Sequence, residues 1–159
     1  MAQICTTIEQ SKRLCELGIS NETADMSWHS TGIRSKALEY ELKTNRLMAK
    51  ENLLDRIGKL VSLHYKHPDG TPMTGEEVFD KIWGKDIPAW SLGALIKLLP
   101  DKIKEDRFGI NYYLTIDKDG IKYSNRMEDE ENEYECYGEL IDSCVDMIDT
   151  LVAEGCIKV

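Results

Sequence analysis

Apolar positions along the chain recur at two spacings, three to four residues apart in some segments and two apart in others. The clearest helical pattern runs over 139–154, where an apolar stripe lies opposite Asp142, Asp146 and Asp149. This spacing predicts an amphipathic helix whose apolar stripe packs on a core. The stripe consists of Leu140, Ile141, Cys144, Val145, Ile148, Leu151 and Val152.

Capping residues predict two more helices. Thr6 and Glu9 have the spacing of a capping box, and the helix that they begin is expected to end at Gly18. The segment 74–83 repeats the pattern, because its first residue is a threonine and Glu77 follows three positions later. Both helices are therefore expected to begin at a threonine.

The most apolar segment of the chain is "DIPAWSLGALIKLLP". Ser91 is a favourable N-cap, and Trp90 and Leu95 occupy the positions of a hydrophobic staple. Pro100 disfavours continuation of the helix through the residue before it. These signals predict one short buried helix over 92–99, with a scaffold role rather than a binding role.

The middle of the chain is harder to interpret. Apolar residues at three- and four-residue spacing predict a helix over 50–66, ended by "HPDGTP". In 33–45, Leu38, Tyr40 and Leu42 alternate as in a strand, whereas the content of Ala, Leu, Glu and Lys favours a helix. Both alternatives stay open for 33–45, and composition slightly favours the helix.

One β-hairpin is predicted with clear signals. Over Tyr112–Tyr123, alternating apolar residues flank the loop Asp117–Gly120, which ends in glycine. A further strand is expected at Tyr134–Tyr137 and a short extended piece at Met26–His29. Together the elements predict an α+β fold, in which several helices pack on a small antiparallel sheet built around this hairpin. We expect a single domain over 1–159 with a helical insertion at about 30–85.

Charge is unevenly distributed along the 159 residues, whose net charge is −9. The segment 127–157 holds 11 of the 29 acidic residues and none of the 20 basic ones. By contrast, 34–66 holds eight basic residues and four acidic ones. The chain therefore has an acidic C-terminal part and a locally basic middle.

The acidic part is a candidate interaction surface. It would suit an unknown basic protein partner, for example as a decoy for the phosphates of nucleic acid. The alternative is a solvated loop followed by a solvated helix face, which is the commoner situation. The candidate residues are Glu128, Asp129, Glu130, Glu131, Glu133, Glu135, Asp142, Asp146 and Asp149.

The basic middle is a candidate for contact with nucleic acid or with a second copy of the chain. Interleaved acids dilute it and the overall pI of about 4.9 opposes nucleic-acid binding, which is therefore not expected. Docking on the acidic part of another copy would give a salt-sensitive homo-oligomer. The basic residues concerned are Arg34, Lys36, Lys43, Arg46, Lys50, Arg56 and Lys59.

Aromatic residues suggest a candidate pocket. Trp28, His29, Trp83 and Trp90 could line a site for a small molecule or nucleotide, although a single histidine more often has a structural role. No motif for a nucleophile, a phosphate loop or a zinc protease occurs, so no catalytic residue is nominated.

No metal or cofactor is predicted. Asp117 and Asp119 begin a calcium-like pattern that fails at Ile121, and His64 with His67 has no third ligand near in sequence. The five cysteines form no CxxC pair and are expected to be reduced thiols. No apolar run is long enough for a membrane span and no signal-peptide pattern occurs, so a cytoplasmic location is expected.

Four blocks carry a resemblance to a known family: "CTTIEQSKRLCELGISNETADMSW", "IPAWSLGALIKLLP", "YLTIDKDGIKYSN" and "DSCVDMIDTLVAEGCI". Together they resemble a family of small uncharacterised proteins of gut bacteria, their prophages and other mobile elements. The resemblance covers residues 4–29 and 86–157 and departs from the family in the middle of the chain. It implies a phage-associated, cytoplasmic context and carries over no catalytic residues.

The function expected from these features is that of a non-enzymatic protein-interaction module of phage or mobile-element origin, acting through the acidic C-terminal surface. The alternative is a protein that binds a small molecule or nucleotide in an aromatic-lined pocket, with enzymatic activity left open.

Overall fold

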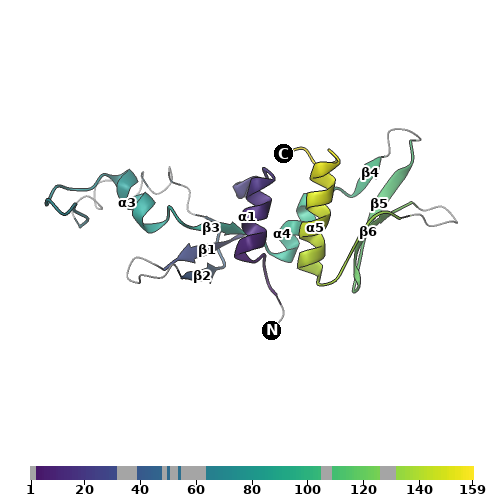
Figure 1. Cartoon of the computed structure of the whole chain (residues 1–159), viewed down its shortest axis with the longest axis horizontal. Coiled ribbons are helices and arrows are strands. Elements are labelled where there is room, and N and C mark those ends of the chain that lie inside the picture. Colours follow the sequence, from purple (N-terminus) through teal and green to yellow (C-terminus); the bar gives the residue numbers. More distant parts are fainter. Residues whose placement is uncertain are drawn as a thin grey trace. The chain divides into compact units, whose positions relative to one another are not determined.

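The computed structural model describes residues 3–31, 39–47, 50, 54, 64–104, 109–125 and 132–159, with Asn132 and Glu133 described by their backbone only. The chain divides into two compact units, shown in Figure 1. Unit 1 consists of Met1–Asp25 and Ala89–Val159, and unit 2 consists of Met26–Pro88. Helices and two small antiparallel sheets among the described residues confirm the predicted α+β class.

Unit 1 contains a four-stranded antiparallel sheet in the order β4-β5-β6-β7. The predicted hairpin forms from β5 (Asn111–Asp117) and β6 (Gly120–Ser124), with Asp117 opposite Gly120 at its turn. The predicted third strand is also present as β7 (Asn132–Tyr137). The fourth strand, β4 (Lys102–Lys104), is too short to show an alternating pattern and was not expected from the sequence.

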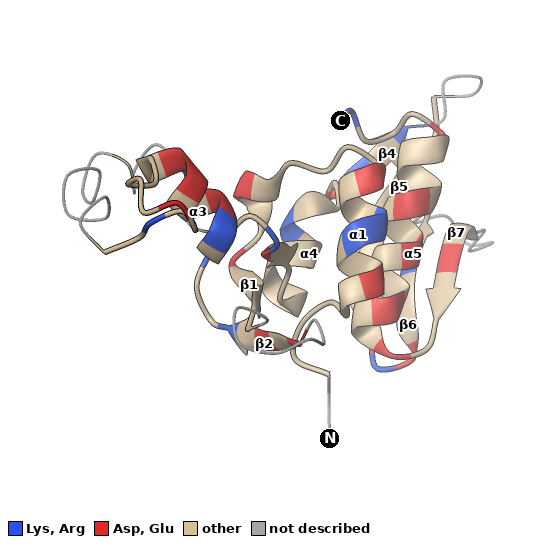
Figure 2. Cartoon of the chain, turned by 60° about the vertical axis from the view of Figure 1, so that its left-hand side comes forward, with Lys and Arg blue, Asp and Glu red and all other residues tan. Residues whose placement is uncertain are grey.

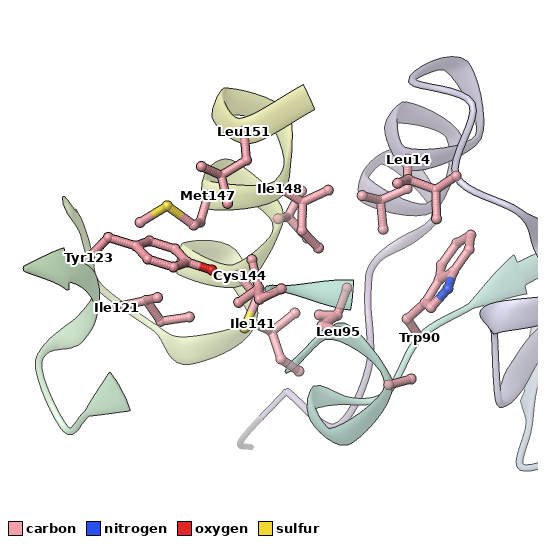
Figure 3. Packing of buried hydrophobic residues seen from close by; sticks show 14 of the residues in the cluster. Leu14, Trp90, Leu95, Ile121, Tyr123, Ile141, Cys144, Met147, Ile148 and Leu151 are labelled. Atoms are coloured by element: carbon pink, nitrogen blue, oxygen red, sulfur yellow. The ribbon is translucent and has the colours of Figure 1, made fainter. Parts of the chain in front are cut away.

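Helix α5 (Leu140–Ala153) organises the core of unit 1. It packs on β6 and β7 and also contacts α4 (Leu92–Leu98) and α1 (Ile8–Glu16), and Figure 2 labels all of these elements. Seven of its 14 residues are buried: Ile141, Ser143, Cys144, Val145, Met147, Ile148 and Leu151. Figure 3 shows this stripe between Tyr123 on one side and Leu95 and Leu14 on the other.

Helix α1 begins one residue later than the sequence indicates. Its N-cap is Thr7, whose side chain and that of Gln10 form the capping box. Thr6 cannot cap the helix because its side chain is fully buried and bonded to the hydroxyl of Ser11 at 2.8 Å. The predicted end is confirmed, since the N–H of Ile19 bonds the carbonyl of Leu14.

Trp90 anchors the entrance of α4 in the core. Its side chain is completely buried, and its indole N–H donates to Thr23 at 2.8 Å. Its backbone exchanges two hydrogen bonds with Thr6. The next residue, Ser91, caps α4 as predicted and also donates from its N–H and hydroxyl to Asp25. The short buried helix predicted for this segment is therefore confirmed, and it ends at Leu98, one residue earlier than predicted.

Unit 2 is built around a sheet in the order β2-β1-β3 and one helix. Strand β1 (Met26–Ser30) pairs antiparallel with β2 (Tyr40–Lys43), and β3 spans Ile87–Ala89. Helix α3 (Gly75–Ile82) begins at the predicted capping box of Thr74 and Glu77. A short 3-10 helix, η1 (Asn21–Thr23), precedes β1 and belongs to unit 1.

The composition-based preference for a helix in 33–45 is wrong for Tyr40–Lys43, which form a strand. The alternation of Tyr40 and Leu42 was the correct signal. Tyr40 pairs with Ser30 and Leu42 pairs with Trp28 on β1, and residues two apart lie on the same face of a strand. Residues 32–38 lie outside the described part of the chain. Of the helix predicted over 50–66, Lys50 and Leu54 are helical, and 51–53 and 55–63 lie outside the described residues. The prediction is wrong for 64–66, where His64 is in a turn and Lys66 forms an isolated β-bridge with Pro72.

None of the helices in the described ranges is both long and apolar enough to cross a membrane.

Gly120 shows how closely the hairpin approaches β7. A Cβ placed there would lie 2.1 Å from the carbonyl oxygen of Cys136 and 2.9 Å from the Cα of Tyr137. Both of these are backbone atoms, so they can move only if the sheet itself is distorted.

We therefore predict that Gly120→Ala destabilises the protein by more than about 2 kcal/mol, because backbone strain and a steric clash combine. Gly155→Ala is the control, since Gly155 also has a positive φ of 72° but no atom lies near its added Cβ. Urea unfolding should show the larger loss for Gly120→Ala. Equal losses would mean that the clash contributes nothing.

Candidate functional site

A cavity of about 170 Å³ lies within unit 2 and is partly open to solvent. Its lining comes from β1, from β2 and the residues after it, and from the turn that follows α3. The lining residues are Ser27, His29, Lys43, Asn45, Arg46, Trp83 and Asp86. Six of these seven side chains are polar, so the cavity is a candidate site for a polar ligand.

His29 and Asp86 form a hydrogen-bonded pair in this cavity. Nδ1 of His29 lies 2.9 and 3.0 Å from the two carboxylate oxygens of Asp86. The carboxylate is only 6% exposed and also accepts from the backbone N–H of Ser30 at 3.0 Å. Because a carboxylate accepts, Nδ1 of His29 carries the donated proton. The other ring nitrogen, Nε2, has no partner among the described residues.

The turn after α3 positions two of the lining side chains. Trp83 caps the helix, and its carbonyl accepts from the N–H of Asp86 at 2.9 Å. Gly84 permits this turn, because a Cβ there would lie 2.4 Å from the carbonyl oxygen of Asp80. Backbone hydrogen bonds of this turn therefore place Trp83 and Asp86 at the cavity, where the side chain of Asp86 also bonds His29 and Ser30.

The register of β1 and β2 explains the positions of the basic residues. Ser27 lies opposite Lys43, and His29 lies opposite Glu41. Lys43 donates to Glu41 at 2.8 Å, and this hydrogen bond, with the charge of Lys43, lowers the pKa of Glu41. Lys43 is thus already paired within the strand, although its side chain remains 41% exposed.

Arg46 differs from the other charged groups of the cavity. It follows β2, is exposed, and has no hydrogen-bond or ion-pair partner in the described part of the chain. The side-chain amide of Asn45 and the indole N–H of Trp83 likewise have no partner there. The cavity therefore presents several uncommitted donors, whereas its buried carboxylate, Asp86, is occupied by His29 and Ser30.

The cavity contains no poised nucleophile. The Ser27 hydroxyl is buried and donates to the carbonyl of Asn45 at 3.0 Å, so it does not face His29 as in a catalytic triad. All five cysteines are free and none lines the cavity. Burial raises the pKa of the Cys144 thiol to about 12, which keeps it protonated. The described lining of the cavity thus consists of hydrogen-bonding side chains and one indole.

The structure brings together two of the four residues predicted for a pocket, His29 and Trp83. Trp28 does not line the cavity, because it alternates with His29 along β1 and faces the other side of the sheet. Trp90 does not line it either, since it is buried in the core of unit 1. Sequence reasoning did not nominate Ser27, Asn45 or Asp86 for this site, and it named Lys43 and Arg46 only within the basic middle.

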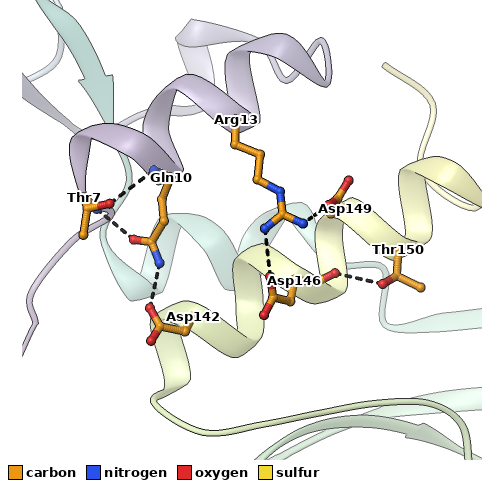
Figure 4. Close-up of polar contacts among 7 residues, drawn as sticks. All are labelled: Thr7, Gln10, Arg13, Asp142, Asp146, Asp149 and Thr150. Atoms are coloured by element: carbon orange, nitrogen blue, oxygen red, sulfur yellow. Dashed lines mark hydrogen bonds and ion pairs between the residues drawn. The ribbon is translucent and has the colours of Figure 1, made fainter.

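The predicted acidic surface is partly used within unit 1, where α1 lies along α5 (Figure 4). Asp142 accepts from the side chain of Gln10 at 2.6 Å. Arg13 donates to Asp146 at 3.0 Å and also to Asp149. The aspartates therefore form the interface with α1, although Figure 2 shows α5 as a strongly acidic helix.

The remainder of that surface is less defined. Glu135 is exposed on β7 and accepts from the hydroxyl of Tyr137 at 2.9 Å. Glu128, Asp129, Glu130 and Glu131 lie outside the described residues, as does the side chain of Glu133. An interaction role for these residues stays a prediction.

No group of three metal-binding side chains occurs within the described ranges. Of the two histidines singled out from the sequence, His67 lies 3.4 Å from the carboxylate of Glu77, in the first turn of α3.

Replacement of Asp86 by alanine should change the tautomer of His29. Without the carboxylate, neutral His29 is expected to shift from the Nδ1–H form toward the Nε2–H form that is usual in solution, because no other residue in the described part of the chain accepts the proton on Nδ1. Nitrogen chemical shifts of the imidazole measure this directly. Glu41→Gln is the control and should keep the Nδ1–H form; a variant at Asp86 that also keeps it would show that another group orients the ring.

Replacement of Arg13 by glutamine should weaken unit 1 slightly. The side chain is 47% exposed, so loss of both ion pairs is expected to cost less than about 1 kcal/mol, and the loss should shrink in high salt. Urea unfolding at two salt concentrations measures both effects. Lys12→Gln removes an equal charge next to it and should have no salt-dependent effect; similar curves for the two variants would mean that the ion pairs do not stabilise the helix contact.

Comparison with protein-family models, with curated proteins and with solved structures finds no match to this chain. The resemblance to proteins of gut bacteria, prophages and mobile elements therefore stays a prediction from the sequence.

Proposed function

We propose that the protein binds a small oxyanion, a phosphate or carboxylate group, in the cavity of unit 2. The observation that carries this proposal is Arg46, a cation with no partner among the described residues that lines the same cavity as His29. A guanidinium forms strong, paired hydrogen bonds with oxyanions, which makes it the side chain best suited to such a ligand.

The other polar groups support an anion rather than a cation. The carboxylate of Asp86 is occupied by His29 and Ser30, and that of Glu41 is paired with Lys43. Asn45 and Trp83 add uncommitted N–H donors to the lining. A ligand that enters the cavity thus meets free donors and compensated carboxylates, which favours a group rich in acceptor oxygens.

The distribution of charge along the chain also favours an anionic ligand in this cavity. Although the whole chain carries a charge of −9, the segment 34–66 that includes Lys43 and Arg46 has eight basic and four acidic residues. An anion would therefore be attracted to this part of the chain while the acidic C-terminal part repels it.

The cavity volume limits the ligand's size. Pockets that enclose drug-sized molecules measure roughly 300–1,000 Å³, and this one measures about 170 Å³. It suits a small molecule, or the head group of a larger one whose remainder extends into solvent.

The acidic surface is a weaker basis for function. Its best-described members, Asp142, Asp146 and Asp149, serve the contact between α1 and α5. A protein-interaction role in a phage-associated context rests on the sequence resemblance and on the charge pattern alone.

Titration with inorganic phosphate tests the proposed site. We expect it to shift the amide and side-chain NMR signals of the cavity residues, and Arg46→Gln to raise the Kd at least about fivefold, because a charge-assisted hydrogen bond is lost. Lys118→Gln is the matched control, since Lys118 is exposed on the hairpin turn of unit 1 and should leave the Kd unchanged.

Two outcomes would contradict the proposal. One is the absence of shifts at the cavity up to high millimolar phosphate, with shifts confined to other lysines and arginines. The other is an equal change in Kd for the Arg46 and Lys118 variants, which would indicate general screening of charge rather than a site.

A further inference from the structure

Trp83 gives the cavity a wall that an oxyanion alone would not use. We infer that the ligand carries a planar ring next to its oxyanion, which makes it an aryl phosphate or an aryl carboxylate. This inference rests on the proposed oxyanion site and specifies the chemical class of ligand that the site takes.

The first argument for this inference is the environment of Trp83. Its indole lines the cavity, is only partly buried, and contacts the ring of Phe79 with the ring centroids 5.7 Å apart and tilted by 36°. Phe79 in turn lies beneath the ammonium group of Lys50, which is 5.9 Å from the ring centroid. The indole is thus held from the side of α3 while it still contributes surface to the cavity.

The second argument is energetic. An oxyanion seated at Arg46 would leave the indole surface in contact with water, whereas a ring attached to that oxyanion could cover it. Offset or edge-to-face contact between aromatic rings contributes beyond simple burial of area. A ring on the ligand therefore increases affinity only if Trp83 is present, while the oxyanion depends on Arg46.

The two groups come from separate elements of unit 2. Trp83 stands at the end of α3 and is fixed by the turn at Gly84, whereas Arg46 follows β2. One can therefore be replaced without displacing the other, which allows the ring and the charge to be tested independently.

The experiment compares four probes in two matched pairs: inorganic phosphate with phenyl phosphate, and acetate with benzoate. Kd values are measured by NMR titration on the wild type, Trp83→Phe, Trp83→Leu and Arg46→Gln. The indole N–H signal of Trp83 is assigned as the one that Trp83→Phe removes, and backbone signals report binding in every variant.

In the wild type we expect the aryl member of at least one pair to bind on the order of tenfold more tightly than its small partner. Trp83→Leu should abolish that ratio, because the indole N–H that it also removes changes the Kd of both members of a pair by the same factor, whereas loss of the ring affects only the aryl member. Trp83→Phe should keep most of the ratio, because it retains a ring. Arg46→Gln should weaken both members of the pair while leaving their ratio in place.

The failures are distinguishable. If the small anions bind through Arg46 but the aryl anions bind no more tightly, the ring inference is overturned and the oxyanion site stands. The ring inference is likewise overturned if Trp83→Leu, with backbone signals showing a folded unit 2, keeps the full ratio. If no probe binds in an Arg46-dependent way, the proposed function fails and this inference with it.

Discussion

Burial of the apolar face of α5 is the interaction on which unit 1 depends. The helix is covered by the sheet through β6 and β7, by α4 and by α1, which are far apart in the sequence. A fully buried side chain such as Ile148 or Leu151 contributes about 1.5–3 kcal/mol relative to exposure. These contacts come from both segments of unit 1. Helix α5 therefore joins the segment that precedes unit 2 in the sequence to the segment that follows it.

Polar contacts then fix where the two segments of unit 1 meet. Thr6 and Trp90 exchange backbone and hydroxyl hydrogen bonds, and Asp25 accepts two hydrogen bonds from Ser91. Burial acts against ionisation of Asp25, but the hydrogen bonds from Ser91 outweigh it and hold its pKa below the usual value. The chain thus leaves unit 1 and returns to it at neighbouring, tied positions, as is common where one compact unit is inserted into another.

The elements that the sequence predicted well are those with local signals. Capping at Thr74 and Ser91, the hairpin turn and the period of α5 depend on neighbouring residues, and each is present. The cap of α1 was placed one residue early because the burial of Thr6 depends on Trp90, which is distant in sequence. Met147 was missed in the apolar stripe because α5 is covered on more than one side, which no single-face pattern reveals.

The candidate site was only partly predictable for the same reason. His29 and Trp83 stood out by residue type, but the partner of His29 is Asp86, and no local pattern links the two positions. The register of β1 and β2 brings Lys43 to Ser27, and it could be found only once 40–43 was assigned to a strand. Charge alone drew attention to the acidic end of the chain, whereas Arg46, which has no partner among the described residues, lies in the middle.

The turn after α3 carries two side chains of the cavity with different roles: Trp83 contributes an apolar surface, and Asp86 orients His29. Because its hydrogen bonds are made by the backbone, the residue at position 83 can be exchanged while Asp86 continues to orient His29. Specificity for the body of a ligand can therefore diverge, by evolution or by design, without rebuilding the part that recognises its charge. Within this one turn, the side chain at position 83 and the pair of Asp86 and His29 can change independently.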